Sequence, residues 1–431
     1  MTLKLGIIGG ASSYTPRVVK GLIERQGDVP VRRITLMDPN RERLEVIASL
    51  VRILCCEGGV KTEVETTSEA ERAIDGADFL ISQVRIGGLA ARTRDERTPL
   101  DFDMIGNETV GAGGFASALR ILPYAVELAA MVERLSPQTV IINFTNPSGI
   151  VTEAVLKHTA ARIVGLCNIP TDLRIGFSEY LKVGLERVTL DYFGLNHLAW
   201  VRKVYLDGED VLPGLIAEST GPEKGLYRRG LVDRLIPPAL LRIWGMVPNW
   251  YVRFYCCPDT ILAEQKRAAT VRGERDVEIE ARLLEMYAAG EFGPEAEQLL
   301  DKKGGTHYAE AALDVMESMV LDKGARFVLD VRNGGALPEL PSDVCVEVPA
   351  IVRRSGIEPL PIGPMPLAVR GLVQAVKAHE ELTVEAALTG DRGLALEALM
   401  ANPLVGSYDK AKGYLERVLE ADREYLPSFF S

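Results

Sequence analysis

The chain has 431 residues, 47% of them hydrophobic and 25% charged, which is the composition of ordinary globular proteins, and its length predicts two domains. With 49 Lys and Arg residues against 60 Asp and Glu residues the net charge is −11, which argues against nucleic acid or an anionic membrane as the main partner. We recognise no apolar run that would span a membrane and no signal peptide, so we expect a cytoplasmic protein. The six cysteines include no C-x-x-C pair, so we expect reduced thiols.

The first 170 residues alternate apolar, β-branched segments with amphipathic ones. The apolar segments include LKLGIIGG, RRITLMD, ADFLISQVR, TVIINFTNP and ARIVGLCNIP. This alternation is typical of a parallel, doubly wound sheet covered by helices. We therefore predict an α/β fold whose Rossmann-like domain spans residues 1–185.

The pattern changes near residue 186. The segment RVTLDYFGLNHLAWVRKVYLDGEDVL predicts two or three strands, and mostly helical periodicity follows it. We predict that residues 186–431 form an α+β domain that carries substrate, metal and subunit contacts.

The segment GIIGGASSYTP resembles a dinucleotide-binding turn with unusual residues. Gly9 fits the tight turn of the G-x-G-x-x-G fingerprint, whereas Ala11 and Tyr14 stand at its second and third glycine positions. Asp38 ends the next predicted strand, where a carboxylate can accept hydrogen bonds from the adenosine ribose and favour NAD over NADP. The alternative is an ordinary glycine-rich turn with an acidic loop residue. The expected cofactor residues are Gly9, Gly10, Ser13 and Asp38.

Polar residues follow several of the predicted strands. They are Arg85, Asn143, Asn146, Cys167, Asn168, Asn196 and His197. Because ligands of parallel sheets bind outside the carboxyl ends of the strands, at least the groups before residue 170 should face one crevice. Cys167 and His197 would suit a divalent transition metal with open coordination positions, and the alternative is a buried thiol and a core histidine.

Two arginines lie near glycines, Arg92 in GGLAARTR and Arg272 in ATVRGERD. An arginine in such a place can clamp a phosphate through paired hydrogen bonds, and the alternative is a solvated charge. Tyr251 lies in VPNWYVRFYCC, an aromatic segment that by pattern alone indicates core or interface.

Taken together, these motifs resemble glycoside hydrolase family 4 over nearly the whole chain. The motifs are GGASSYTP, RIGGLAAR, IGNETVGAGGF, NFTNPSG, GLCNIP, GLNHLAW, WYVRFY and VRNGG. The resemblance is greatest to the 6-phospho-β-glucosidases of this NAD-dependent family. It implies an architecture similar to lactate and malate dehydrogenases and a 6-phosphorylated glycoside as substrate. It also implies Mn²⁺ as a second cofactor.

The resemblance further implies an oxidation–elimination mechanism. NAD takes hydride from C3 of the sugar, a base removes the C2 proton, the glycosidic oxygen leaves, water adds at C1 and the C3 ketone is reduced again. Cys167 and His197 would hold the metal, and Tyr251 would be the base. Asn168 would be a further catalytic residue and points to β-glycosides. The residues expected to contact the phosphorylated sugar are Arg92, Asn146 and Arg272.

The sequence leaves other activities open. They are a 6-phospho-α-glycosidase of the same family, a net NAD-dependent dehydrogenase of a sugar or hydroxy acid, and a cofactor-binding regulator without chemistry. Ala11 and Asn107 depart from the family pattern and leave cofactor affinity and sugar positioning open. We expect a homodimer or homotetramer.

Overall fold

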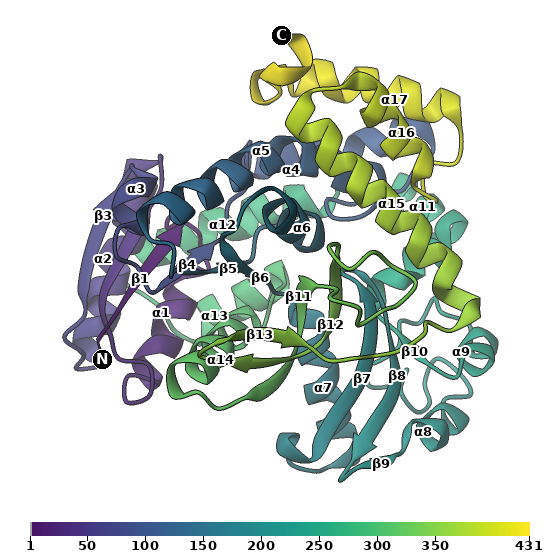
Figure 1. Ribbon diagram of the computed structural model, residues 1–431, viewed down its shortest axis with the longest axis horizontal. Helices are drawn as coiled ribbons and strands as arrows, with labels where there is room; N and C mark the ends of the chain where they lie inside the picture. The colour runs from purple at the N-terminus through teal and green to yellow at the C-terminus, as the bar shows by residue number, and fades with distance from the viewer. Residues whose placement is uncertain (1) are drawn as a thin grey trace.

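One nine-stranded sheet runs through the computed structural model, which describes residues 2–431 (Figure 1). Its order is β13-β12-β11-β6-β5-β4-β1-β2-β3. The six parallel strands are β1 (Leu3–Ile8), β2 (Val31–Met37), β3 (Glu63–Thr67), β4 (Phe79–Ser82), β5 (Val140–Asn143) and β6 (Arg162–Gly165). The order 3-2-1-4-5-6 is that of a dinucleotide-binding doubly wound sheet, so the predicted fold class is confirmed.

Helices cover this parallel part of the sheet. They are α1 (Thr15–Glu24), α2 (Arg41–Glu57), α3 (Ala70–Ile74), α4 (Gly88–Arg97), α5 (Gly111–Leu135), α6 (Ser148–His158) and α7 (Asn168–Leu181). Figure 1 shows α5 and α6 on one side of the sheet and α1 on the other. Strands buried on both faces explain the nearly continuous apolar runs of β1, β4 and β5.

Three later strands extend the same sheet in antiparallel fashion. They are β11 (Ala325–Arg332), β12 (Cys345–Arg353) and β13 (Gly356–Pro359). These strands were not predicted, because the sequence after RVTLDYFGLNHLAWVRKVYLDGEDVL was expected to be mostly helical. Strand β12 is buried along nearly its whole length, and a buried apolar run lacks the alternation that separates a strand from a helix.

The predicted strands after residue 186 form a separate small sheet. Its members are β7 (Val188–Leu195), β8 (Leu198–Leu206), β9 (Glu209–Asp210) and β10 (Val247–Pro248). The later helices are α8 (Leu212–Glu218), α9 (Pro238–Trp244), α10 (Arg253–Cys256), α11 (Pro258–Arg267), α12 (Arg272–Ala288), α13 (Pro294–Lys303), α14 (Tyr308–Leu321), α15 (Leu367–Thr389), α16 (Arg392–Ala401) and α17 (Tyr408–Ala421). Figure 1 shows α15, α16 and α17 gathered at the C-terminal end of the chain, beside α5.

Helix α5 corrects the expectation that no apolar run is long enough to cross a membrane. By length and composition it is the one helix within residues 2–431 that could do so. However, 61% of its most apolar window is buried, and its side chains form a core with α15, α16 and α17. A central helix of a globular core passes the same test of length and apolarity.

Candidate functional site

The turn between β1 and α1 requires glycine at two successive positions. Gly9 has a φ of +78°, and a Cβ atom there would lie 2.6 Å from the Gln83 carbonyl oxygen. A Cβ atom on Gly10 would lie 2.9 Å from both Leu36 Cβ and Met37 N. The close approach of β2 and β4 therefore explains both glycines, and it keeps the turn tight enough for a cofactor phosphate to reach the backbone.

Asp38 and Ser13 are tied into this turn from different directions. The Asp38 carboxylate accepts hydrogen bonds from Ala11 N at 3.3 Å and Asn40 N at 2.9 Å. Ser13 is fully buried, and its hydroxyl accepts from Lys303 Nζ at 2.9 Å and donates to Glu280 at 3.3 Å. Helices α12 and α13 thus support the turn from far along the chain. The cofactor contacts of both residues stay predictions.

The polar residues expected at the ends of the parallel strands share one edge of the sheet. Strands β4, β5 and β6 are neighbours with the same direction, so Arg85, Asn143 and Cys167 lie at one edge of the sheet. His197 lies in the two-residue turn between β7 and β8 and has a φ of +63°. A left-handed backbone at a residue with a side chain costs about 1 kcal/mol, and such strain gathers at functional sites.

Tyr251 contacts one predicted metal ligand and lies near other predicted site residues. Its ring stacks on the His197 imidazole, with ring centroids 3.9 Å apart and planes 7° from parallel. Burial raises the pKa of the Tyr251 phenol, the nearby Arg272 guanidinium opposes that rise, and Glu108 and Cys167 add to it. These electrostatic effects act over short distances, so the fold brings Cys167, His197, Tyr251 and Arg272 together.

Cys167 and His197 have the chemistry of metal ligands. Burial lowers the pKa of His197 to about 4, which keeps the imidazole neutral, and its Nδ1 atom is buried without a hydrogen-bond partner. Burial and Glu347 raise the pKa of the Cys167 thiol well above its usual value, and a cation would favour the thiolate. The buried Asn146 Oδ1 is also unpartnered.

These two side chains would leave most positions of a metal ion open. Within residues 2–431, no group of three or more His, Cys, Asp or Glu side chains could hold a metal ion. A metal held by one thiolate and one imidazole would therefore take its remaining ligands from bound oxygen atoms, such as those of a sugar. The residues present fit that arrangement.

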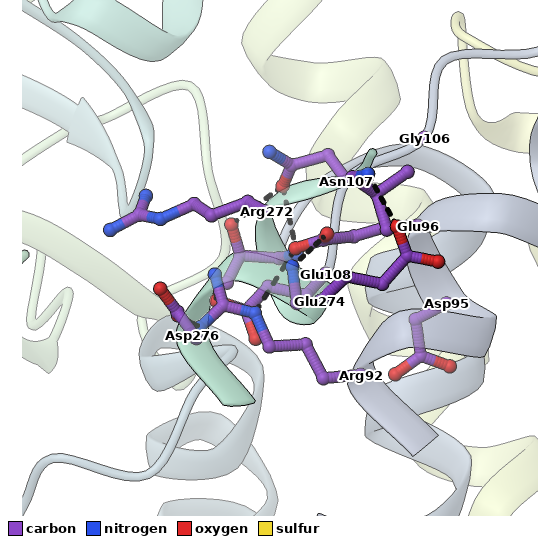
Figure 2. Close-up of polar contacts among 12 residues, drawn as sticks. Arg92, Asp95, Glu96, Gly106, Asn107, Glu108, Arg272, Glu274 and Asp276 are labelled. Atoms are coloured by element: carbon purple, nitrogen blue, oxygen red, sulfur yellow. Dashed lines mark hydrogen bonds and ion pairs between the residues drawn. The ribbon is translucent and has the colours of Figure 1, made fainter. Parts of the chain in front are cut away.

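Arg92 is held by carboxylates on three sides (Figure 2). Its Nε atom lies 3.0 Å from Glu96, its Nη2 atom 2.9 Å from Glu108, and its Nη1 atom is paired with Asp276. The side chain is nearly fully buried, so a phosphate that used it would compete with three anions. A direct contact between Arg92 and the sugar stays a prediction, whereas the ion pair between Arg92 and Glu108 is present in the structure.

Glu108 is a site residue that the sequence analysis did not single out. Burial favours its neutral form, but Arg85, Arg92 and Arg272 together lower its pKa to about 2. It is therefore a carboxylate near neutral pH, and it acts electrostatically on both His197 and Tyr251. Its motif, IGNETVGAGGF, was recognised as a whole, but the sequence could not reveal which arginines surround it.

Arg272 is freer than Arg92. Figure 2 shows its side chain extended away from the carboxylates around Arg92. It is the first residue of α12, and its Nη2 atom donates to the Lys303 carbonyl at 2.6 Å. Several of its remaining N–H groups can receive an anion, which supports the predicted phosphate contact.

Asn168 and Asn146 contact two residues that the sequence analysis did not assign to the site. Asn168 Nδ2 donates to Asp172 Oδ2 at 2.6 Å, and the other oxygen of Asp172 bonds His307 Nδ1. This bond to Asp172 raises the pKa of His307 against the opposing effect of burial. Asn146 Nδ2 lies 3.5 Å from the Tyr308 hydroxyl.

A buried hydrogen-bond network fixes the backbone segments that carry His197 and Tyr251. Glu347, on β12, accepts from Asn196 Nδ2 at 3.0 Å and from the Tyr192 hydroxyl at 2.6 Å. Asn249 Nδ2 donates to the Tyr192 hydroxyl at 3.1 Å, and Asn249 Oδ1 accepts from Tyr251 N at 3.0 Å. One buried carboxyl group, on Glu347, thus connects the turn that contains His197 with the turn that carries Tyr251. An acidic residue in the apolar run CVEVPAIV was the available sequence signal.

Comparison with known proteins shows the family to which the chain belongs. Residues 4–183 match the model of the family 4 glycosyl hydrolases, and residues 192–405 match that of the family 4 glycosyl hydrolase C-terminal domain. A probable 6-phospho-beta-glucosidase of Bacillus subtilis is 36% identical, over 100% of this chain and 98% of the relative. A phospho-alpha-glucosidase of Clostridium acetobutylicum is 31% identical, over 97% of each chain.

Solved structures give the same result. The 6-phospho-beta-glucosidase of Thermotoga maritima, solved with manganese, NAD⁺ and glucose-6-phosphate, has a TM-score of 0.89 and 33% identity, over 98% of this chain and 99% of that one. Malate dehydrogenase of Plasmodium falciparum, at 14% identity over 89% of this chain and 98% of that one, has a TM-score of 0.51 and shares the fold. The resemblance seen in the sequence is confirmed, and the chain belongs to glycosyl hydrolase family 4.

Proposed function

We propose that this chain hydrolyses 6-phospho-β-glucosides with the help of bound NAD and a divalent metal ion such as Mn²⁺. When bound, NAD supplies a reversible acceptor for hydride from C3 of the sugar, and the metal supplies a Lewis acid for the C2 and C3 oxygens. Cys167 and His197 would hold the metal. The cofactor would be held by the β1–α1 turn and Asp38, and the phosphorylated sugar by Arg92, Asn146 and Arg272.

Tyr251 would act as the base of the reaction. Once C3 is a ketone, the phenolate removes the C2 proton and the glycosidic oxygen leaves by elimination. Water then adds at C1, a proton returns to C2, and the ketone is reduced again. Burial raises the pKa of Tyr251, so the phenolate needs positive charge nearby. Arg272 already acts in that direction, and a cation at Cys167 and His197 would add to it.

One observation carries this proposal. The phenol of Tyr251 stacks on a neutral imidazole whose Nδ1 atom is buried without a partner, beside the buried thiol of Cys167. A proton acceptor next to a pair of metal ligands is the arrangement that C2 deprotonation beside a polarised ketone requires.

The test is turnover of a chromogenic 6-phospho-β-glucoside with NAD, Mn²⁺ and a thiol reductant. We expect aglycone release that stops when NAD and Mn²⁺ are both removed. NAD is reduced and then re-oxidised in every cycle, and the metal is the Lewis acid, so the proposed reaction needs both. Persistent turnover without them would contradict the mechanism. Steady accumulation of NADH would instead indicate a net dehydrogenase, and NAD binding without C2 hydrogen exchange would indicate a regulator. A panel of α- and β-linked substrates, with and without the phosphate, measures the anomer preference directly.

We further propose a cytoplasmic enzyme that acts as a homodimer or homotetramer, with neither a membrane nor nucleic acid as partner. In this proposal residues 1–185 bind the cofactor and residues 186–431 supply substrate and subunit contacts, with Arg92, Asn146 and Cys167 contributed across that boundary. Light scattering coupled to size-exclusion chromatography gives the subunit number, and a monomer at micromolar concentration would exclude a homodimer or homotetramer.

A further inference from the structure

Asp172 connects Asn168 to His307 through its two carboxylate oxygens. It lies one helical turn after Asn168 on α7, where residues four apart share a face. Its Oδ2 atom accepts from Asn168 Nδ2 at 2.6 Å, and its Oδ1 atom bonds His307 Nδ1, in the segment between α13 and α14. Asp172 is 14% exposed, and His307 is 31% exposed.

This contact decides which way the Asn168 carboxamide faces. A carboxylate only accepts hydrogen bonds, so the NH₂ group of Asn168 must point toward Asp172. The carbonyl oxygen then points away from Asp172. Asn168 can therefore accept a hydrogen bond from a sugar hydroxyl, or offer an oxygen to a cation, while Asp172 engages one of its two amide N–H groups.

His307 belongs to a short segment that contacts several other parts of the site. The Lys303 carbonyl accepts from Arg272, and the Gly304 carbonyl accepts from the Tyr14 hydroxyl on the cofactor turn. The next residue after His307 is Tyr308, whose hydroxyl lies 3.5 Å from Asn146 Nδ2. The position of His307 is therefore tied to the predicted phosphate, cofactor and sugar contacts.

We propose that Asp172 and His307 are positioning residues that orient the Asn168 carboxamide, and that Asp172 determines that an amide rather than a carboxylate can function at position 168. The role of Asn168 toward the sugar rests on the function proposed above, whereas the coupling between positions 168 and 172 does not. An aspartate at 168 would place two carboxylates at hydrogen-bond distance, where like charges repel strongly unless one of them takes up a proton.

A double-mutant cycle tests this coupling. Asn168→Asp alone brings the two carboxylates together, and Asp172→Asn alone removes the charge that His307 contacts. The double variant Asn168→Asp with Asp172→Asn restores an amide–carboxylate pair with the direction of the hydrogen bond reversed and the net charge of the wild type. We expect thermal stability to be lower in Asn168→Asp and to recover in the double variant, with the two changes non-additive by about tenfold or more in the folding equilibrium.

Kinetics then report on positioning. We expect His307→Phe, which keeps a ring but removes the donor, to lower kcat for the 6-phospho-β-glucoside by about tenfold with a smaller change in KM. His307→Asn, which keeps a donor near the position of Nδ1, should regain most of that loss. The matched control is His158→Asn, because His158 is equally exposed and faces Glu385 at 3.4 Å on the surface. That variant should behave as wild type.

Two results would overturn the inference. One is additivity of the two substitutions in thermal stability, which would show that residues 168 and 172 are not coupled. The other is equal kcat for His307→Phe and His307→Asn in an active wild-type background. Inactivity of the wild type toward every phosphorylated glucoside would reject the proposed function, but it would leave the stability cycle as an independent measurement of the coupling.

Discussion

The buried carboxylate of Glu347 offers a test of how the site is held in place. Burial and the neighbouring Asp330 raise the pKa of Glu347 well above its usual value, so a neutral amide at this position would imitate the protonated carboxyl group. Glu347→Met instead keeps the length of the side chain and removes both oxygens, to which Asn196 Nδ2 and the Tyr192 hydroxyl donate in the wild type. Tyr192 already accepts from Asn249, so its hydroxyl proton would be left without a partner.

The structure gives a size for this effect. An unsatisfied buried polar group costs about 1–3 kcal/mol. If that cost falls on the turn that carries His197, kcat/KM should drop by about 5- to 150-fold, at about 1.4 kcal/mol per factor of ten. The affinity for Mn²⁺, measured by electron paramagnetic resonance titration, should fall in parallel because the His197 imidazole is displaced.

Asp330→Leu is the matched control for this substitution. Asp330 lies opposite Glu347 in the β11–β12 ladder and is equally buried, but it accepts a hydrogen bond from the Ser148 hydroxyl at 2.7 Å and none from the turn that contains His197. The control should lose stability while its Mn²⁺ affinity stays close to that of the wild type. If Glu347→Met lost stability to the same extent as the control and kept both kcat/KM and Mn²⁺ affinity, Glu347 would have no role in holding the site.

Three further predictions concern the anion contact, the cofactor turn and the pH dependence of stability. Arg272→Ala should raise KM for 6-phosphorylated substrates by about 10- to 100-fold, the loss of a charge-assisted hydrogen bond, and an unchanged KM would remove Arg272 from the phosphate site. Gly10→Ala should lower both melting temperature and NAD affinity, because its Cβ would lie 2.9 Å from Leu36 Cβ and Met37 N, and calorimetric titration that finds wild-type affinity would count against the assigned turn. Burial lowers the pKa of His379 to about 4, so stability present above pH 6.5 should be lost as pH falls toward 4, where the unfolded chain alone binds the proton. His379→Gln should flatten this dependence by up to about 3 kcal/mol in metal-free protein, and an identical slope in both proteins would contradict the assignment.

The parallel half of the fold could be predicted because its sequence alternates strongly. Each apolar segment that was recognised as a strand of the doubly wound sheet is one, and the polar residues at the ends of β4, β5 and β6 do share an edge. Strands β11 to β13 could not be found in the same way. They join the parallel sheet through the pairing of Asp330 with Gly165, which are far apart in sequence, and the burial of β12 removes the alternation that marks an exposed strand.

Some residues of the candidate site could likewise be predicted from the sequence, and others could not. Cys167, His197 and Tyr251 could be proposed from residue type, strand ends and family motifs. The residues that hold them, Glu347 and Glu108, could not, because their roles depend on which distant side chains surround them. The sequence also could not reveal the partners of Arg92. Its sequence context suggested a free phosphate clamp, but the fold places it among Glu96, Glu108 and Asp276.

Solvent hydrogen exchange at C2 of the sugar tests the central claim most directly. The reaction is run in D₂O with a 6-phospho-β-glucoside, NAD and Mn²⁺, and the glucose 6-phosphate formed is analysed by NMR. If Tyr251 removes the C2 proton before the aglycone leaves, the product carries deuterium at C2 and Tyr251→Phe loses turnover. Complete turnover by the wild type with protium retained at C2 would show that the glycosidic bond breaks by another route.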